Sequence, residues 1–280
     1  MRRRFLPMIV VSVMAVGLAS DLSAAPQAEL WTRWQQHNAQ NPTTIDFTFW
    51  QTFLERYLDS QHPSGVHRLR YGQVSPEDRQ RLQHYLAIQQ QVTISAYSPR
   101  EQLAYWINLY NAATVSLILE HFPVASIRDI RLSGLFRVGP WQAKLLTIEG
   151  EPVSLDDIEH RIIRPIWRDN RVHYALNCAS LGCPNLAPVV YTSTNLEALL
   201  DQGARAYINH PRGVFCQDTT CTVSSIYVWF QEDFGGTFAG VVQHLLPYAN
   251  DTLATQLRAY RGQWKHRYDW RLNAPEVPGP

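Results

Sequence analysis

Apolar residues recur at helical spacing in the first part of the chain. Between residues 27 and 60 the apolar positions include Leu30, Trp34, Trp50, Phe53 and Tyr57. A spacing of three to four residues places such side chains on one face of a helix. The pattern therefore predicts helical structure over 27–60.

Two serine–proline pairs mark sharper helix starts, in Ser75-Pro76-Glu77-Asp78 and in Ser98-Pro99-Arg100-Glu101. Serine is a typical N-cap, proline suits the first helical position, and acidic residues favour the first turn. The first helix is expected to run to about residue 91. The second is apolar on nearly all sides as far as Leu119, which is typical of a buried central helix.

Shorter patterns along the rest of the chain predict strands and further helices. Strands are expected at 144–148, at 172–176 and in a hairpin of 214–216 with 221–225. Helices are expected after Ser154 and over 194–207, 238–246 and 251–260, and Trp229–Phe234 is interpreted as a strand end entering a short helix. We expect an α+β single domain, with the buried central helix packed against a small, mostly antiparallel sheet.

The N-terminal residues have the order of a secretory signal. Met1-Arg2-Arg3-Arg4 is followed by an apolar run and then by Ser23-Ala24-Ala25. This order predicts a signal peptide over 1–24, a globular domain over 25–273 and a flexible tail over 274–280. It favours a periplasmic or secreted protein, with an uncleaved N-terminal anchor as the alternative.

The net charge of the chain after removal of residues 1–24 limits the kinds of binding partner that are expected. Removal of residues 1–24 lowers the basic residues from 25 to 22 and the acidic residues from 24 to 23, a net charge near −1. Nucleic-acid binding normally needs a basic surface, so no nucleic-acid partner is expected. No membrane span is expected in the mature form. A peptide, a glycan or an envelope protein stays open as partner, and the sequence leaves the oligomeric state open.

Four cysteines are present, Cys178, Cys183, Cys216 and Cys221. Export favours their oxidation. Cys216 and Cys221 flank a polar turn between two β-like runs, which predicts a local disulfide across a hairpin. Cys178 and Cys183 have the same spacing and could form a second disulfide.

Reactive side chains are densest between residues 156 and 184. Here and in four other blocks the sequence resembles the bacterial and plant domain-of-unknown-function family 547. The resemblance lies in Tyr105–Ala112, Leu155–His160, His173–Pro184, Trp229–Phe234 and Tyr268–Asn273. The family implies no established activity, so the resemblance assigns no role to these residues.

One hypothesis is a cysteine-dependent hydrolase or acyltransferase acting on a peptide or amide. Cys178 is the candidate nucleophile and His173 or His160 the base, and Glu159, Asp157 or Asn108 is the group that orients the base. Backbone amides near 179–182 could form an oxyanion hole. A disulfide between Cys178 and Cys183 would silence this chemistry.

A second hypothesis is a zinc site on His160, His173, Cys178 and Cys183, which are zinc ligand types. Their spacing is poor for zinc, so no metal or cofactor is predicted.

The favoured hypothesis is a non-catalytic binding or envelope-structure module with a cleft near His173 and Cys178. Asn108, Asn111, Asn177 and Ser180 are its candidate binding residues. The asparagines at 108 and 111 could instead form a structural network that fixes neighbouring loops. Whether the protein is an enzyme stays open at this point.

Overall fold

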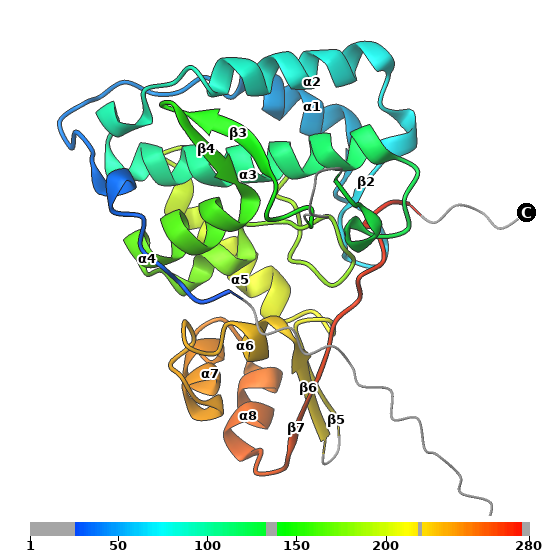
Figure 1. The fold of residues 1–280 in the computed structure, drawn as a ribbon. Helices are drawn as coiled ribbons and strands as arrows, with labels where there is room; N and C mark the ends of the chain where they lie inside the picture. Colours follow the sequence, from blue (N-terminus) through cyan, green and yellow to red (C-terminus); the bar gives the residue numbers. More distant parts are fainter. Residues whose placement is uncertain (1–25, 133–138, 218–219, 276–280) are drawn as a thin grey trace, which may run out of the picture.

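The fold comes from a computed structural model that describes residues 26–132, 139–217 and 220–275 (Figure 1). The signal peptide predicted over 1–24 and residues 276–280 of the predicted tail lie outside the described residues. In the described part of the chain, none of the helices combines the length and apolarity needed to cross a membrane.

Both serine–proline helix starts are confirmed. Helix α2 is Pro76–Gln89 and helix α3 is Pro99–His121. The Ser75 hydroxyl accepts a hydrogen bond from Asp78 N, and the Ser98 hydroxyl accepts one from Glu101 N. Every residue of α3 from Glu101 to Leu119 is buried, so α3 is the central helix that its apolar sequence predicts.

The helix predicted over 27–60 is mostly wrong. A short 3-10 helix covers Thr32–Gln35, and helix α1 begins only at Thr48 and ends at Tyr57. Between them, the side chains of Asn41 and Asp46 accept hydrogen bonds from the backbone N–H groups of Thr43 and Thr48. Such local bonds hold the backbone in turns that compete with a helix.

A first hydrophobic core surrounds α3. It includes residues of α1 and α2, of the antiparallel hairpin β3 (Lys144–Ile148) with β4 (Glu151–Ser154), and of the π-helix Asp157–Ile163. Helix α4 (Arg164–Trp167) continues from the π-helix. A further antiparallel pair joins β1 (Leu58–Asp59) to β2 (Arg68–Leu69).

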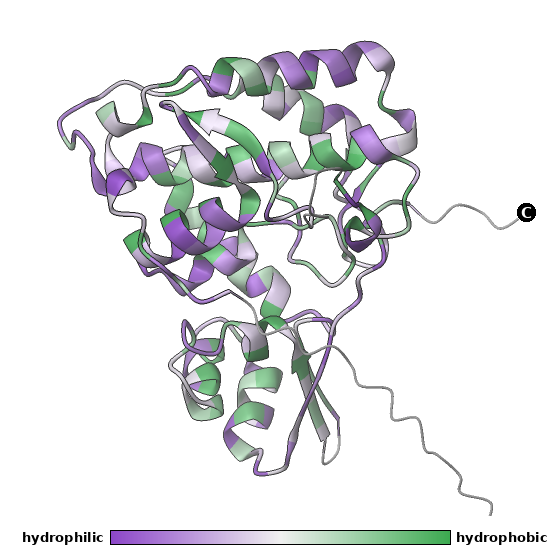
Figure 2. Ribbon diagram, viewed as in Figure 1, coloured by the Kyte–Doolittle hydropathy of each residue, from purple (hydrophilic) through white to green (hydrophobic). Residues whose placement is uncertain are grey.

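A second core lies below the first in Figure 1. Strand β6 (Thr220–Ser224) pairs antiparallel with β5 (Val214–Gln217) and parallel with β7 (Trp264–Arg267). Helices α6 (Ile226–Trp229), α7 (Phe238–Leu245) and α8 (Asp251–Ala259) lie beside this sheet, and α5 (Leu196–Ile208) contributes side chains to both cores. In Figure 2, α2 at the outer edge is mostly hydrophilic, whereas β6 and α7 carry hydrophobic residues.

The chain is an α+β protein, as its sequence predicts. The described residues form three small sheets rather than one. Two local predictions are wrong: residues 172–176 overlap the 3-10 helix Asn170–Tyr174 and are not a strand, and Trp229 ends helix α6 rather than a strand. The hairpin disulfide between Cys216 and Cys221 is confirmed.

Candidate functional site

A cavity of about 440 Å³ lies where several distant segments meet. Its volume falls in the range of roughly 300–1,000 Å³ that is usual for small-molecule sites. Helix α3, the π-helix, the loop after His173, helix α6 and the chain after β7 all contribute to its wall. The residues that line the cavity include Pro26, Tyr110, Arg128, Arg131, Trp141, Asp156, Glu159, His160, His173, Cys178, Cys183, Trp229, Phe230, Tyr268 and Trp270.

Two asparagine side chains fix the backbone of the loop that carries Cys178. Asn111 Nδ2 donates to Ala175 O at 2.9 Å, and Asn111 Oδ1 accepts from Asn177 N at 2.8 Å. Asn177 in turn bonds Ala179 N and Pro184 O through its side chain. Ala179 can therefore keep its left-handed backbone, with φ of 60°, because both ends of the loop are fixed.

Backbone hydrogen bonds also join the same loop to the C-terminal segment. Gly182 N donates to Asp269 O at 2.8 Å, and Leu181 N donates to Arg271 O at 2.8 Å. A Cβ atom on Gly182 would lie 2.7 Å from Asp269 N, so only glycine allows this close approach. The approach brings Tyr268 to the thiol of Cys178.

Cys178 and Cys183 are free thiols in contact with each other. Their sulfurs lie 2.7 Å apart, and Cys178 N donates to Cys183 Sγ at 2.9 Å. A disulfide bond is about 2.05 Å long, so the second disulfide expected from the sequence is not formed in this structure. Cys178 is partly exposed on the cavity, whereas Cys183 is buried.

Two hydroxyl groups lie beside the Cys178 sulfur. Tyr268 OH lies 3.2 Å from it and Ser180 Oγ lies 3.3 Å from it. The Ser180 hydroxyl donates to Tyr268 OH at 3.1 Å, which leaves the Tyr268 proton to donate to the sulfur. The Cys183 thiol, followed by Ser180 and Tyr268, lowers the pKa of Cys178 against the opposing effect of burial, because these groups stabilise the thiolate. Burial raises the pKa of Cys183 and of Tyr268, so Tyr268 stays a donor at neutral pH.

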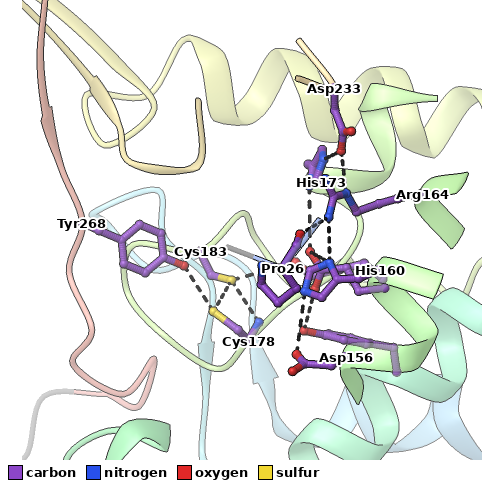
Figure 3. A network of polar contacts seen from close by, with 12 residues as sticks. Pro26, Asp156, His160, Arg164, His173, Cys178, Cys183, Asp233 and Tyr268 are labelled. Carbon is purple, nitrogen blue, oxygen red and sulfur yellow. Dashed lines mark hydrogen bonds and ion pairs between the residues drawn. The ribbon is translucent and has the colours of Figure 1, made fainter. Parts of the chain in front are cut away.

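The two histidines lie on another part of the cavity wall (Figure 3). His173 Nε2 lies 2.6 Å from Asp233 Oδ2, and Arg164 Nε donates to the same oxygen at 2.6 Å. Arg164 Nη1 also lies 3.0 Å from His160 Nδ1. The histidines are thus fixed by a buried charge network, in which Asp233 is the anion.

Two carboxyl groups complete this wall. Glu159 Oε2 accepts from Tyr110 OH at 3.2 Å, and Glu159 Oε1 lies 3.9–4.0 Å from His173 Nδ1 and His160 Nδ1. Burial raises the pKa of Asp156 to about 6 and lowers the pKa of His160. Both shifts follow from the loss of water around the charged form.

The start of the described chain closes over the histidines. Arg164 Nη1 donates to Pro26 O at 2.8 Å, and Glu29 N and Trp31 N donate to the carbonyls of His160 and Arg161. Pro26 itself lines the cavity, between the thiol pair and His160 in the view of Figure 3. The N-terminal segment therefore helps to shape the site.

The structure brings the four predicted catalytic residues, Cys178, His173, His160 and Glu159, to one cavity. No hydrogen bond between described residues joins the Cys178 thiol to either imidazole. Three backbone amides proposed for an oxyanion hole, at 179, 181 and 182, already donate within the protein. The thiol is activated by hydroxyl and thiol donors rather than by an imidazole.

The predicted binding residues are not among those that line the cavity. Asn108 bonds both backbone groups of Tyr191, at 2.7 and 3.1 Å, so Asn108, Asn111 and Asn177 hold loops behind the cavity. Ser180 is buried and contacts the thiol. Across the described ranges, His, Cys, Asp and Glu side chains form no group of three that could hold a metal ion.

Sequence reasoning missed Tyr110, Arg164 and Tyr268 as site residues, and it missed the tryptophans of the cavity wall. Tyr268 lies in a block that already carried the family resemblance, but 90 residues separate it from Cys178. Asp233 also lies in a block that carried the family resemblance, and its carboxylate contacts His173 Nε2 at 2.6 Å.

Part of the chain is similar to a known protein family. Residues 94–208 match the family model described as "Protein of unknown function, DUF547". This range contains α3, the π-helix and the Cys178 loop, but not Tyr268, Trp229 or Trp270. Neither the curated proteins nor the solved structures include a significant match.

Proposed function

We propose that this protein binds a short peptide segment in the cavity beside Cys178. Residues 94–208 match the DUF547 family, whose function is unknown, so the support for the proposal comes from the cavity. The observation that carries the proposal is the composition of the wall, where aromatic rings, both signs of charge and an activated thiol surround one ligand-sized space. The pattern of residues 1–25 and the Cys216–Cys221 disulfide support a periplasmic or secreted site of action.

The aromatic part of the wall is preorganised. The ring of Trp270 lies 5.5 Å from that of Trp229 and 4.6 Å from that of Tyr268, and Trp141 meets it edge-on at 5.8 Å. Rings held by one another lose little freedom when a ligand arrives. Such a surface favours apolar or aromatic side chains of a peptide, and it could also stack a sugar ring.

The charges favour the peptide over the glycan. Arg128 lies over the Trp270 ring at 5.2 Å and lines the cavity together with Arg131, while Asp156 and Glu159 line it with carboxyl groups. A peptide can present charges of both signs and backbone amides to such a wall. A neutral oligosaccharide would leave these groups without charged partners, at a cost in affinity.

The second candidate function is cysteine-dependent acyl transfer on the bound peptide. The lowered pKa of Cys178 on the cavity wall favours it. The occupied amides at 179, 181 and 182 and the missing thiol–imidazole hydrogen bond weigh against it. We therefore place peptide binding first.

Affinity selection tests the proposal. The protein is incubated with a randomised heptapeptide library and, separately, with a mixture of neutral oligosaccharides, and retained molecules are identified by mass spectrometry. We expect retained peptides, with enrichment at least about tenfold lower for Trp270→Ala. Trp264→Ala is the matched control, because Trp264 stacks on Phe238 at 5.5 Å outside the cavity. Retention of oligosaccharides alone, or of neither class, contradicts the proposal.

A further inference from the structure

We propose that Cys178 and Cys183 are a thiol–disulfide exchange pair whose substrate is a peptide disulfide bound in the cavity. The proposal rests on the peptide-binding function above, and it adds a reaction and a substrate class. It is carried by the contact between the two sulfurs, by the donors around one of them and by their unequal exposure.

The two cysteines differ in exposure. Both line the cavity, but Cys178 is partly exposed, whereas Cys183 is only 4% exposed. A substrate disulfide therefore reaches Cys178 more readily than Cys183. Cys178 is the attacking residue, and Cys183 is the residue that resolves the mixed disulfide.

The surroundings match these two roles. Tyr268 OH lies 3.2 Å from Cys178 Sγ, accepts from the Ser180 hydroxyl and stabilises the Cys178 thiolate, which is the form that attacks a disulfide. Cys183 keeps its proton longer because it is buried. Its sulfur already lies 2.7 Å from Cys178 Sγ, so the second step needs only a small movement.

The steps balance without a further oxidant. The Cys178 thiolate attacks one sulfur of the substrate R–S–S–R′, forms Cys178–S–S–R and releases R′S⁻, which takes up the proton lost by Cys178. Cys183 then attacks Cys178 Sγ and passes its proton to the departing RS⁻. The products are a Cys178–Cys183 disulfide, RSH and R′SH, so two electrons move from the protein to the substrate. The reverse steps, with a dithiol peptide, restore the thiols.

Variants of the full mature chain trap the mixed disulfide. The probes are a disulfide-linked dimer of a short cysteine peptide from the affinity selection and, for comparison, hydroxyethyl disulfide. With the peptide disulfide, we expect the wild type to lose 2 Da and to release two peptide thiols per protein. We expect Cys183→Ser to accumulate a peptide adduct on Cys178, and Cys178→Ser to form no adduct at Cys183.

Three results would overturn the inference. They are a wild-type protein that never forms the Cys178–Cys183 bridge, an adduct on Cys178→Ser that forms as fast as on Cys183→Ser, and a rate with hydroxyethyl disulfide equal to that with the peptide disulfide. Peptide retention by Cys178→Ser separates the two proposals. If this variant still retains peptides while the wild type does not react, the exchange fails and the binding function stands.

A second measurement does not depend on cysteine substitutions. Tyr268→Phe removes a donor to the Cys178 sulfur and should slow its alkylation by iodoacetamide at pH 7 at least about fivefold. Tyr227→Phe is the matched control, because Tyr227 OH bonds Tyr174 OH in the second core and has no contact with the thiols. Equal rates for Tyr268→Phe and the wild type would contradict the role given to Tyr268.

Discussion

His173 Nε2 and Asp233 Oδ2 lie 2.6 Å apart and join two parts of the chain that are 60 residues apart in sequence. The same carboxylate oxygen receives Arg164 Nε at 2.6 Å. The side chain of Arg164 is only 3% exposed, and that of His173 only 2%. One anion therefore neutralises a buried guanidinium and positions a buried imidazole of the cavity wall.

Asp233→Asn should lower the free energy of unfolding by about 3–5 kcal/mol, because it leaves the buried charge of Arg164 without its anion. Urea unfolding at pH 7 measures the loss. Asp269→Asn is the control: its partner Arg271 has a side chain that is 77% exposed, and the expected loss is at most about 1 kcal/mol. Equal losses in the two variants would mean that the network around Asp233 is not a stabilising one.

The lowered pKa of Asp233 predicts that the folded protein loses stability in acid. Its pKa is held well below the ordinary value by His173 and Arg164, which oppose the effect of burial. Its contribution is therefore present above the unfolded-state pKa of about 4 and is lost as the pH falls through the lower folded-state pKa. Wild-type stability should decline below about pH 4, and Asp233→Asn should decline less steeply over the same range.

The raised pKa of Asp156 predicts the opposite dependence at higher pH, where folding stability decreases as the pH rises. Burial raises its pKa from 3.8 to about 6, so the folded state holds a proton that the unfolded state has already lost. The contribution of Asp156 is fully present below about pH 4 and is lost as the pH rises through about 6. Asp156→Asn should remove this slope and stabilise the protein at pH 8 by about 1–3 kcal/mol. Unfolding at pH 4.5, 6 and 8 tests this, and identical pH profiles for variant and wild type would contradict it.

The hydrogen bonds of Asn111 to the Cys178 loop predict that loss of this side chain both destabilises the protein and exposes a second thiol. Asn111→Ala leaves Ala175 O and Asn177 N without their partner and should cost about 2–4 kcal/mol. The released loop should also expose Cys183, so that two thiols react with iodoacetamide at pH 7 instead of one. Asn38→Ala, at an exposed turn, is the control and should change stability by less than about 1 kcal/mol. A single reactive thiol in Asn111→Ala would show that Asn111 does not hold the loop.

Local signals predicted much of the fold. Ser75 and Ser98 marked two helix starts correctly, and the polar turn between Cys216 and Cys221 marked the hairpin, because capping and turn formation depend on neighbouring residues. The stretch from Val172 to Leu176 misled the prediction because its residues alternate as in a strand, with His173 between apolar residues. The Asp169 side chain accepts from Arg171 N at 2.9 Å and starts a 3-10 helix there, and all five residues are buried.

The site was predictable only in part. Cys178, His160 and His173 stood out because their side chains are reactive and lie within 19 positions of one another. Their actual partners come from distant segments: Tyr268 reaches the thiol because Gly182 lets the C-terminal segment approach, and Asp233 reaches His173 through the turn after α6. Such contacts depend on tertiary packing, which a single sequence does not reveal.

The central claim is that peptide and thiol share one cavity, and protection of Cys178 tests it most directly. Cys178 is alkylated with iodoacetamide at pH 7, with and without a saturating amount of a peptide from the affinity selection, and the labelled cysteine is identified by mass spectrometry. We predict that the bound peptide slows labelling of Cys178 at least about tenfold in the wild type and not in Trp270→Ala. Equal labelling rates with and without a peptide that is demonstrably bound would contradict the claim.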